Sequence, residues 1–420
     1  MALSITARRI LRLLHPAAFA RELRRVSGKL RRRLRRIEDR VVSLEPEGPR
    51  RGRVLLSYVV DPFCLPPGAE PSYDHTHHWE CREMARAWLE AGYAVDAIHW
   101  TNTRFEPGAA YDVLVDPLLN LERLAPRLGP ECLAVLHAET AHHSFHNAAQ
   151  RRRLEALQER RGLELPPARL IEENRAVEHA DAIVVLGNDF TAGTYAFGGR
   201  PMLRVPLSNP FLYPFPEDKD FEAARRRFVW FGSGGLVHKG LDLVLEAFAG
   251  LPDLHLTVCG PIAREPAFER AYWRELYRTR NVTTLGWVDV AGTAFRELAR
   301  TSVAAVYPSC SEGGGGSVIT CMHAGLVPVV TPEASVDVTA ERGVVLREAS
   351  VEGVRRAARE LSNRPAAELR ATARAAWSFA RERHTRETFA REYRRAVREL
   401  LLLEERGPGV PESPGAEAPG

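Results

Sequence analysis

Short apolar runs alternate with longer segments of helical spacing along most of this chain. In its first half, the runs that read as strands are 54–60, 95–100, 111–115, 132–136 and 182–186. Segments 78–91 and 149–161 carry apolar residues at the spacing of amphipathic helices. The alternation stops in the Pro-rich stretch 211–227 and resumes at 228. Strands that alternate with helices predict parallel, doubly wound sheets covered on both faces.

This alternation also divides the chain into domains. A chain of 420 residues with 45% apolar content can bury two cores of ordinary size. We therefore predict an α/β protein with two Rossmann-like domains joined by a hinge. The predicted order is a basic arm at 1–50, a first domain at 53–210, a hinge at 211–227, a second domain at 228–376, a C-terminal helix at 377–404 and a disordered tail at 405–420.

Two glycine-rich turns in the second domain each follow a predicted strand. The first turn joins the strand 228–231 to a helix and carries Lys239, and the second follows the strand 303–307 and contains the glycines 313–316. Glycines let a ligand approach the backbone, and the free N–H groups at a helix start attract anions. Neither turn has the P-loop pattern or the dinucleotide-binding fingerprint. The turns therefore predict a diphosphate site of another kind.

The order of motifs around these turns carries a family resemblance. Lys-Gly leads into a Leu-x-x-Ala-Phe helix, and then come Val-Cys-Gly-Pro, Leu-Gly-Trp-Val, Pro-Ser-x-x-Glu-Gly-x-Gly and His-Ala-Gly-x-x-Pro-Val-Val. This order resembles retaining GT-B glycosyltransferases of the family 4 type, the glycosyl transferases group 1, and is strongest over 228–331. The resemblance implies two domains that face a cleft, with the nucleotide sugar on the second, the acceptor on the first, and a final helix that crosses back.

The resemblance also implies a role for single residues. Glu312 matches the glutamate that contacts the donor sugar, and Thr320 stands where the family has a second glutamate at the ribose. The family's arginine shortly before Lys239 is absent, so His238 or a residue outside the motif would have to replace this cation. The implied catalytic residues are Glu312 and His137, and the implied donor-binding residues are Gly234, Gly235, His238, Lys239, Gly313, Gly314, Gly315, Gly316, Ser317 and Thr320.

Sugar transfer from a nucleoside diphosphate builds negative charge on the leaving group, which fixed cations and N–H dipoles stabilise. With the resemblance, this predicts a retaining glycosyltransferase that moves a sugar from a nucleoside diphosphate donor to a glycan or glycolipid acceptor. The expected setting is polysaccharide or cell-envelope assembly, with no cofactor. Two alternatives stay open. One is a catalytically weak nucleotide-sugar-binding subunit, which would explain why the arginine and the second glutamate are missing. The other is a sugar-nucleotide epimerase of similar fold.

Two segments could suggest a metal site. The Asp-Lys-Asp string at 218–220 has the D-x-D pattern, but it lies in the predicted hinge. His142, His143 and His146 are closely spaced, but if this stretch is a loop after a strand, the spacing does not bring the side chains together, and few carboxylates are adjacent. The prediction is therefore metal-independent transfer without a metal site.

Positive charge is concentrated in the N-terminal arm, where residues 1–50 include 14 basic and 5 acidic side chains. Apolar residues from 23 to 44 recur at helical spacing with arginines between them, which predicts an amphipathic cationic helix. Such a helix could lie on an anionic membrane surface or pair with a partner helix in an oligomer. No nucleic-acid-reading module accompanies it, so nucleic acid is not an expected partner. Segment 8–44 thus predicts peripheral attachment to the inner face of a membrane.

Cysteine spacing and hydropathy bear on location. The 6 cysteines are scattered, without C-x-x-C or metal-ligand spacing, as is typical of reduced thiols. No apolar run approaches the ~18 residues that a membrane span needs. Together these patterns predict a cytoplasmic protein.

Overall fold

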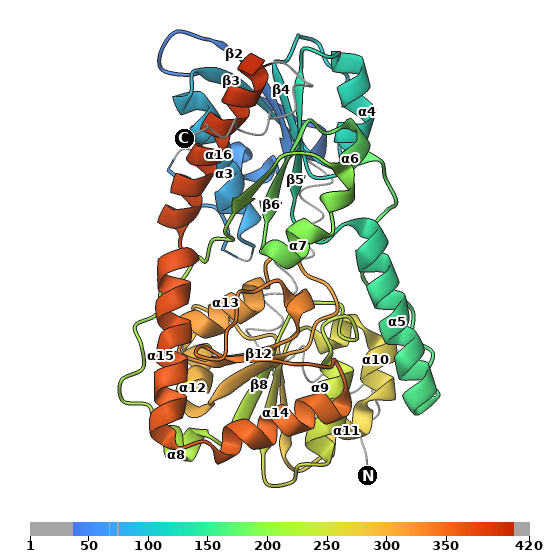
Figure 1. Cartoon of the computed structure of the whole chain (residues 1–420), viewed down its shortest axis with the longest axis vertical. Coiled ribbons are helices and arrows are strands. Elements are labelled where there is room, and N and C mark those ends of the chain that lie inside the picture. Colours follow the sequence, from blue (N-terminus) through green and yellow to red (C-terminus); the bar gives the residue numbers. More distant parts are fainter. Residues whose placement is uncertain (1–36, 67, 74, 407–420) are drawn as a thin grey trace, which may run out of the picture.

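The structure is a computed structural model that describes residues 37–66, 68–73 and 75–406. These residues form two α/β domains that stand one above the other along the long axis, each built around a mainly parallel sheet (Figure 1). This arrangement confirms the predicted architecture of two Rossmann-like domains. Most of the predicted arm, residues 1–36, and the tail from residue 407 lie outside the described residues.

The first domain contains a seven-stranded sheet in the order β1-β3-β2-β4-β5-β6-β7, and only β1 runs antiparallel to its neighbour. The strands are β1 (Val41–Leu44), β2 (Gly52–Tyr58), β3 (Tyr93–His99), β4 (Val113–Asp116), β5 (Leu133–Ala138), β6 (Ala182–Leu186) and β7 (Met202–Val205). The helices are α3 (His77–Glu90), α4 (Leu119–Leu128), α5 (His143–Arg161), α6 (Ala176–His179) and α7 (Asp189–Gly193). Every strand predicted for this region is confirmed.

The predicted arm helix is wrong at its C-terminal end. The sequence pattern extends the helix through Leu44, whereas Val41–Leu44 is a strand that pairs with β3. Ser43 Oγ donates a hydrogen bond to Asp96 Oδ1 at 2.6 Å, and Arg53 Nη1 donates to Asp96 Oδ2 at 2.6 Å. Pairing with β3 satisfies backbone groups that the edge of the sheet would otherwise leave open. The sheet therefore prevails over the helical spacing of these four residues.

The second domain contains a six-stranded parallel sheet in the order β10-β9-β8-β11-β12-β13. The strands are β8 (Arg227–Phe231), β9 (His255–Cys259), β10 (Val282–Gly286), β11 (Ala304–Tyr307), β12 (Val327–Val330) and β13 (Val344–Val345). The helices are α8 (Phe221–Ala224), α9 (Leu241–Ala249), α10 (Pro266–Ala271), α11 (Trp273–Tyr277), α12 (Thr293–Thr301), α13 (Gly316–His323) and α14 (Val351–Asn363). The strands predicted before the two glycine turns are therefore present as β8 and β11.

Long helices on opposite sides of the molecule link the two domains (Figure 1). Helix α5 begins after β5 of the first domain, but Leu157 is buried in the core of the second, and Arg160 Nη2 lies 2.9 Å from Asp242 Oδ2 of α9. Helix α15 (Ala366–Arg383) packs on the second domain, and α16 (Arg386–Arg406) crosses to α3 of the first. The crossing helix thus begins at Arg386, later than residue 377, and it continues to Arg406.

Candidate active site

The first glycine turn, residues 232–240, brings Lys239 to the C-terminal edge of the second sheet. The indole Nε1 of Trp230, on β8, donates a hydrogen bond to the Lys239 carbonyl at 3.1 Å. The Lys239 N–H donates to the Gly235 carbonyl at 2.8 Å, which closes the turn. The Lys239 side chain is 3% exposed. A buried ammonium needs a partner of opposite charge, and the second glycine turn supplies one.

The second turn, residues 308–315, connects β11 to α13 and places Glu312 beside Lys239. Gly315 precedes the helix with φ +56°, and a Cβ there would lie 2.4 Å from Val336 Cγ2 and 2.7 Å from the Ala334 carbonyl oxygen. Only glycine combines this left-handed conformation with so little space. The turn therefore fixes the start of α13, whose first N–H groups form a potential anion site.

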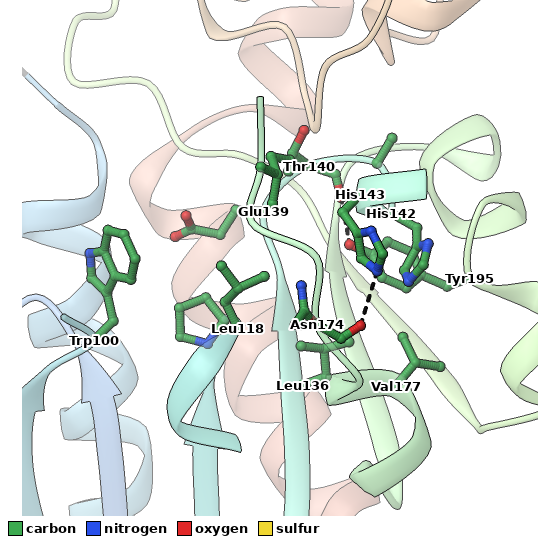
Figure 2. A pocket seen from close by; sticks show the side chains of 13 residues that line it. Trp100, Leu118, Leu136, Glu139, Thr140, His142, His143, Asn174, Val177 and Tyr195 are labelled. Carbon is green, nitrogen blue, oxygen red and sulfur yellow. Dashed lines mark hydrogen bonds between the residues drawn. The ribbon is translucent and has the colours of Figure 1, made fainter. Parts of the chain in front are cut away.

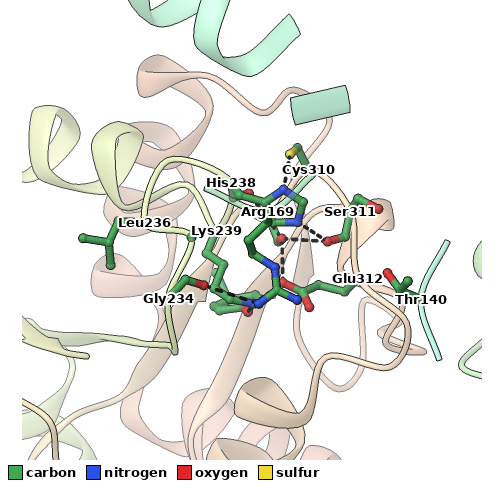
Figure 3. Close-up of polar contacts among 12 residues, drawn as sticks. Thr140, Arg169, Gly234, Leu236, His238, Lys239, Cys310, Ser311 and Glu312 are labelled. Atoms are coloured by element: carbon green, nitrogen blue, oxygen red, sulfur yellow. Dashed lines mark hydrogen bonds and ion pairs between the residues drawn. The ribbon is translucent and has the colours of Figure 1, made fainter. Parts of the chain in front are cut away.

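Lys239 and Glu312 form a buried ion pair that two hydroxyl groups complete (Figure 3). Lys239 Nζ lies 2.5 Å from Glu312 Oε1 and 2.7 Å from the Tyr307 hydroxyl. The Tyr307 hydroxyl and Ser309 Oγ donate to the same carboxylate oxygen at 2.9 and 3.0 Å. Burial would raise the pKa of Glu312, but Lys239 and Arg169 outweigh it and hold this pKa well below its usual range. Glu312 is therefore a carboxylate at neutral pH.

Arg169 brings a second cation to this pair from the first domain. It lies between α5 and α6, and its Nη1 is 3.5 Å from the Gly234 carbonyl oxygen, 65 residues away in sequence (Figure 3). A Cβ on Gly235 would lie 2.3 Å from Arg169 Cδ, so the glycine at this position makes room for the arginine. His146 Nε2, on α5, donates to the Arg169 carbonyl at 2.6 Å and holds the segment in place. Arg169 therefore places a second positive charge near the Lys239–Glu312 pair.

The sequence gives no direct signal for Arg169. It belongs to a segment without helical or strand pattern, and its place at the site depends on how the two domains pack. The sequence hints at such a residue only through the absence of an arginine near Gly234 and Gly235, because a diphosphate site with a single cation needs a further positive group. His238, which the sequence suggested as a replacement for the missing arginine, does not supply this charge, because burial lowers its pKa.

His238 stabilises the turn as a neutral ring. Its Nε2 donates to the Ser311 carbonyl at 2.5 Å, and its ring centroid lies 4.7 Å from that of His146. Burial lowers the pKa of His238 to about 3. The ring therefore joins the two glycine turns to α5, and the positive charge comes from Lys239 and Arg169.

The predicted residues on α13 are also engaged with the protein. Thr320 Oγ1 lies 2.9 Å from both Asn209 Oδ1 and the Gly316 carbonyl oxygen, so its hydroxyl faces the segment before the hinge. Ser317 is in the first turn of α13, close to Tyr307. Ser317 therefore contacts the tyrosine that bonds to the Lys239–Glu312 pair, whereas Thr320 contacts Asn209.

His137 lies on β5 within the core of the first domain. Its ring centroid is 5.1 Å from that of Tyr58 and 6.4 Å from that of Tyr393, and its exposed fraction is 1%. Neither ring nitrogen has a hydrogen-bond partner among the described residues. Burial lowers the pKa of His137 to about 3. The structure does not bring this ring into contact with Glu312, on the opposite domain.

The two domains touch directly beside the second glycine turn. A Cβ on Gly313 would lie 1.7 Å from the Glu139 carbonyl oxygen, so the backbones of the two domains meet there. On α7 of the first domain, Thr191 Oγ1 lies 2.5 Å from Ser335 Oγ of the second. Ser335 Oγ also donates to Asn188 Oδ1 at 3.0 Å. These contacts place the end of β5 against the start of α13.

The histidines after β5 lie at the start of a helix and not in a loop. His142 precedes α5, His143 is its first residue, and His146 is in its first turn, where the helical start is favoured by the His142 side chain accepting from the Ser144 N–H. Among the described residues, no group of three or more His, Cys, Asp or Glu side chains could hold a metal ion.

No helix within residues 37–66, 68–73 and 75–406 is both long and apolar enough to cross a membrane.

Comparisons with known proteins give one family model and several solved structures of similar fold. Residues 225–364 match the family model described as Glycosyl transferases group 1. The chain is similar to sucrose-phosphate synthase from Thermosynechococcus elongatus, with a TM-score of 0.58 and 14% identity over 84% of this chain and 100% of that one. It is also similar to a glycosyltransferase from Rickettsia africae, with a TM-score of 0.52 and 10% identity over 84% and 99% of the two chains.

A third match differs in length. The structure of TarM from S. aureus, solved with UDP among its ligands, has a TM-score of 0.46 and 12% identity over 67% of this chain. This chain covers 54% of that protein. No curated protein sequence matches significantly. At such low identities, the structural similarities concern the fold.

Proposed function

We propose that this chain, in which residues 225–364 form a glycosyl transferases group 1 domain within a GT-B fold, moves a sugar from a nucleoside diphosphate donor to an acceptor hydroxyl. The observation that carries this proposal is the meeting of both glycine turns at the Lys239–Glu312 pair, with Arg169 facing them. Cations beside the free N–H groups of a helix start suit a diphosphate. A carboxylate in the same place suits the hydroxyl groups of a sugar.

The parts of the site would act on different charges of the reaction. As the bond from the sugar to the diphosphate breaks, negative charge grows on the phosphate oxygens, where Lys239, Arg169 and the start of α13 would stabilise it. Positive charge grows on the sugar ring, which Glu312 would stabilise. Because the protein itself supplies the cations, we propose that transfer needs no divalent metal. Following the resemblance, we also propose that the anomeric configuration of the donor is retained.

A donor screen followed by product analysis tests this proposal. Thermal shift against UDP-, GDP-, ADP- and dTDP-sugars should identify the donor, and release of the nucleoside diphosphate should then be measured with and without EDTA. We expect EDTA to leave the rate unchanged and NMR of the product to show the donor's anomeric configuration. An inverted product or a strict requirement for a divalent metal contradicts the mechanism. Binding without any turnover supports the silent-subunit alternative.

We further propose a membrane-assembled glycan or glycolipid as acceptor, reached by peripheral attachment through the basic arm. This proposal depends on the sequence pattern, and because Val41–Leu44 is a strand of the first domain, the attaching segment must end before it. Each basic residue near an anionic surface contributes about 1 kcal/mol, and salt screens this attraction. The competing role is pairing with a partner helix.

Co-sedimentation with anionic vesicles separates these two roles of the arm. At low salt, the full chain should bind, and a variant that lacks residues 1–36 should not, while its donor hydrolysis stays intact because β1 is retained. If the full chain ignores the vesicles and deletion changes its oligomeric state, the arm is an assembly device.

A further inference from the structure

A cavity of about 160 Å³ opens at the carboxyl ends of the strands of the first domain (Figure 2). Such strand ends are where open α/β sheets bind ligands. Trp100 follows β3, Leu118 follows β4, and Glu139 follows β5, so consecutive strands each contribute one wall. Asn174 and Tyr195 complete the opposite side. The Glu139 side chain points across the cavity toward the Trp100 indole (Figure 2).

This cavity shares a wall with the proposed donor site. The Glu139 carbonyl meets the backbone of Gly313 at the second glycine turn, and Thr140, which lines the cavity, also lies beside Glu312 (Figure 3). The cavity is therefore next to the start of α13, on the first-domain side. A group bound there would face a donor sugar held by the second domain.

The cavity lacks positive charge. Its lining is mostly apolar and includes no Lys or Arg side chain. Burial raises the pKa of Glu139 to about 8 and lowers the pKa of His142 to about 4, so both are uncharged near neutral pH. The titratable groups that surround Glu139 are Tyr58 on β2, His77 and Glu80 on α3, Asp116 on β4 and Tyr195 after α7. None of these groups supplies a fixed cation.

We propose that this cavity binds a neutral, hydroxylated ring of the acceptor, such as a terminal uncharged sugar. The Trp100 indole would pack on the apolar face of the ring. Glu139, Thr140 and Asn174 would form hydrogen bonds with its hydroxyl groups. A sugar acid or sugar phosphate would lose its hydration there without gaining a cation, so the cavity would discriminate against it. The assignment to the acceptor depends on the proposed function, whereas binding of the ring can be measured alone.

Saturation-transfer NMR, which measures the binding of sugar probes to the full chain, tests this proposal. The neutral probes are the methyl glycosides of glucose, galactose, mannose and N-acetylglucosamine, and the charged probes are glucuronate, galacturonate and glucose 6-phosphate. We expect at least one neutral glycoside to bind and every charged counterpart to bind at least about tenfold more weakly. Trp100→Ala should weaken the neutral glycoside about tenfold. Trp287→Ala, at a half-exposed tryptophan of the second domain, is the matched control.

Nucleoside diphosphate binding is measured in the same samples. If UDP or GDP binds but no neutral glycoside does, or if a charged counterpart binds as tightly, the cavity proposal fails while the proposed function survives. The proposal also fails if Trp100→Ala and Trp287→Ala give the same affinities. If neither nucleotide nor glycoside binds, both proposals fail.

Discussion

The two domains contribute to the candidate active site in different ways. The second domain supplies Lys239 and Glu312 from two turns that each follow a strand and carry glycines in a recognisable order. The first domain supplies Arg169 from an irregular segment between two helices. One contribution is therefore encoded locally, and the other exists only because the domains are packed together. A diphosphate that contacts both cations would stabilise this packed arrangement.

The first prediction concerns the locally encoded half. Glu312→Gln keeps the shape of the side chain but removes the negative charge that lies beside the proposed donor sugar, so we expect kcat to fall by about a hundredfold or more. Nucleotide affinity should change far less. Steady-state kinetics on the donor found by screening measures the loss. Glu297→Gln, at an exposed glutamate of α12, is the matched control, and an equal rate for both variants removes Glu312 from the mechanism.

Lys239→Met should have the next largest effect. It removes one charged partner of the diphosphate, which corresponds to about 1.5–3 kcal/mol of lost binding free energy. Isothermal titration with UDP and GDP measures this loss. Lys219→Met is the control. Lys219, in the segment 211–227, is also buried, but its Nζ donates to the Gly325 carbonyl at 3.0 Å. If both variants bind the nucleotide like the wild type, Lys239 does not hold the diphosphate.

The contact between the domains can be disturbed with a single methyl group. A Cβ on Gly313 would lie 1.7 Å from the Glu139 carbonyl oxygen, whereas a Cβ on Gly108, far from the proposed donor site, would have no atom within 4 Å. We expect Gly313→Ala to push the domains apart and to weaken nucleotide binding severalfold, because Arg169 then moves away from Lys239. Small-angle scattering should show a larger radius of gyration for Gly313→Ala than for Gly108→Ala. Identical profiles and affinities contradict a direct contact.

The smallest expected effect tests His137. Its pKa is about 3 in the fold and about 6.5 in an unfolded chain. As the pH falls from about 6.5 toward 3, His137 binds a proton in the unfolded chain but stays neutral in the folded protein, so the free energy of unfolding decreases. His137→Leu should remove about 2 kcal/mol of this decrease between pH 6.5 and 4.5, whereas the variant and the wild type should show the same pH dependence of unfolding above about pH 7.5. Urea unfolding at several pH values measures it.

The same variant also distinguishes a packing role from the catalytic role that the resemblance implies. If His137 only fills the core between Tyr58 and Tyr393, kcat at neutral pH should change little. A hundredfold loss of kcat with normal stability would instead support the catalytic role. An unchanged acid dependence of stability would contradict the burial argument.

Much of the fold could be predicted because its pattern is local. The central strands β4, β5 and β6 are short buried apolar runs, and β8 and β11 lead into turns whose glycines are visible in the sequence. Helix α5 was harder to delimit, because its first turn is polar and histidine-rich and so lacks apolar spacing. Strand β1 was missed because four residues can follow a helical and an extended pattern equally well. Pairing with β3 decides between them.

The candidate site could be predicted only on its second-domain side. Lys239 and Glu312 stand in turns with a physical reason for their position, whereas no spacing rule connects Arg169 to them. The distinction between Lys239 and His238 was also invisible, since it depends on burial and on the contact of His238 with Ser311. Long-range packing therefore determines which polar residues near a glycine turn carry charge.

The claim that both domains hold the diphosphate can be tested most directly with Arg169. Isothermal titration should compare Arg169→Ala with Arg175→Ala, an exposed arginine of the same segment that pairs with Glu178. We expect Arg169→Ala to weaken the affinity for UDP or GDP about tenfold and to leave the affinity for uridine or guanosine unchanged. Arg175→Ala should bind all of these ligands like the wild type. Equal diphosphate affinity in all three proteins would contradict a donor site shared by the two domains.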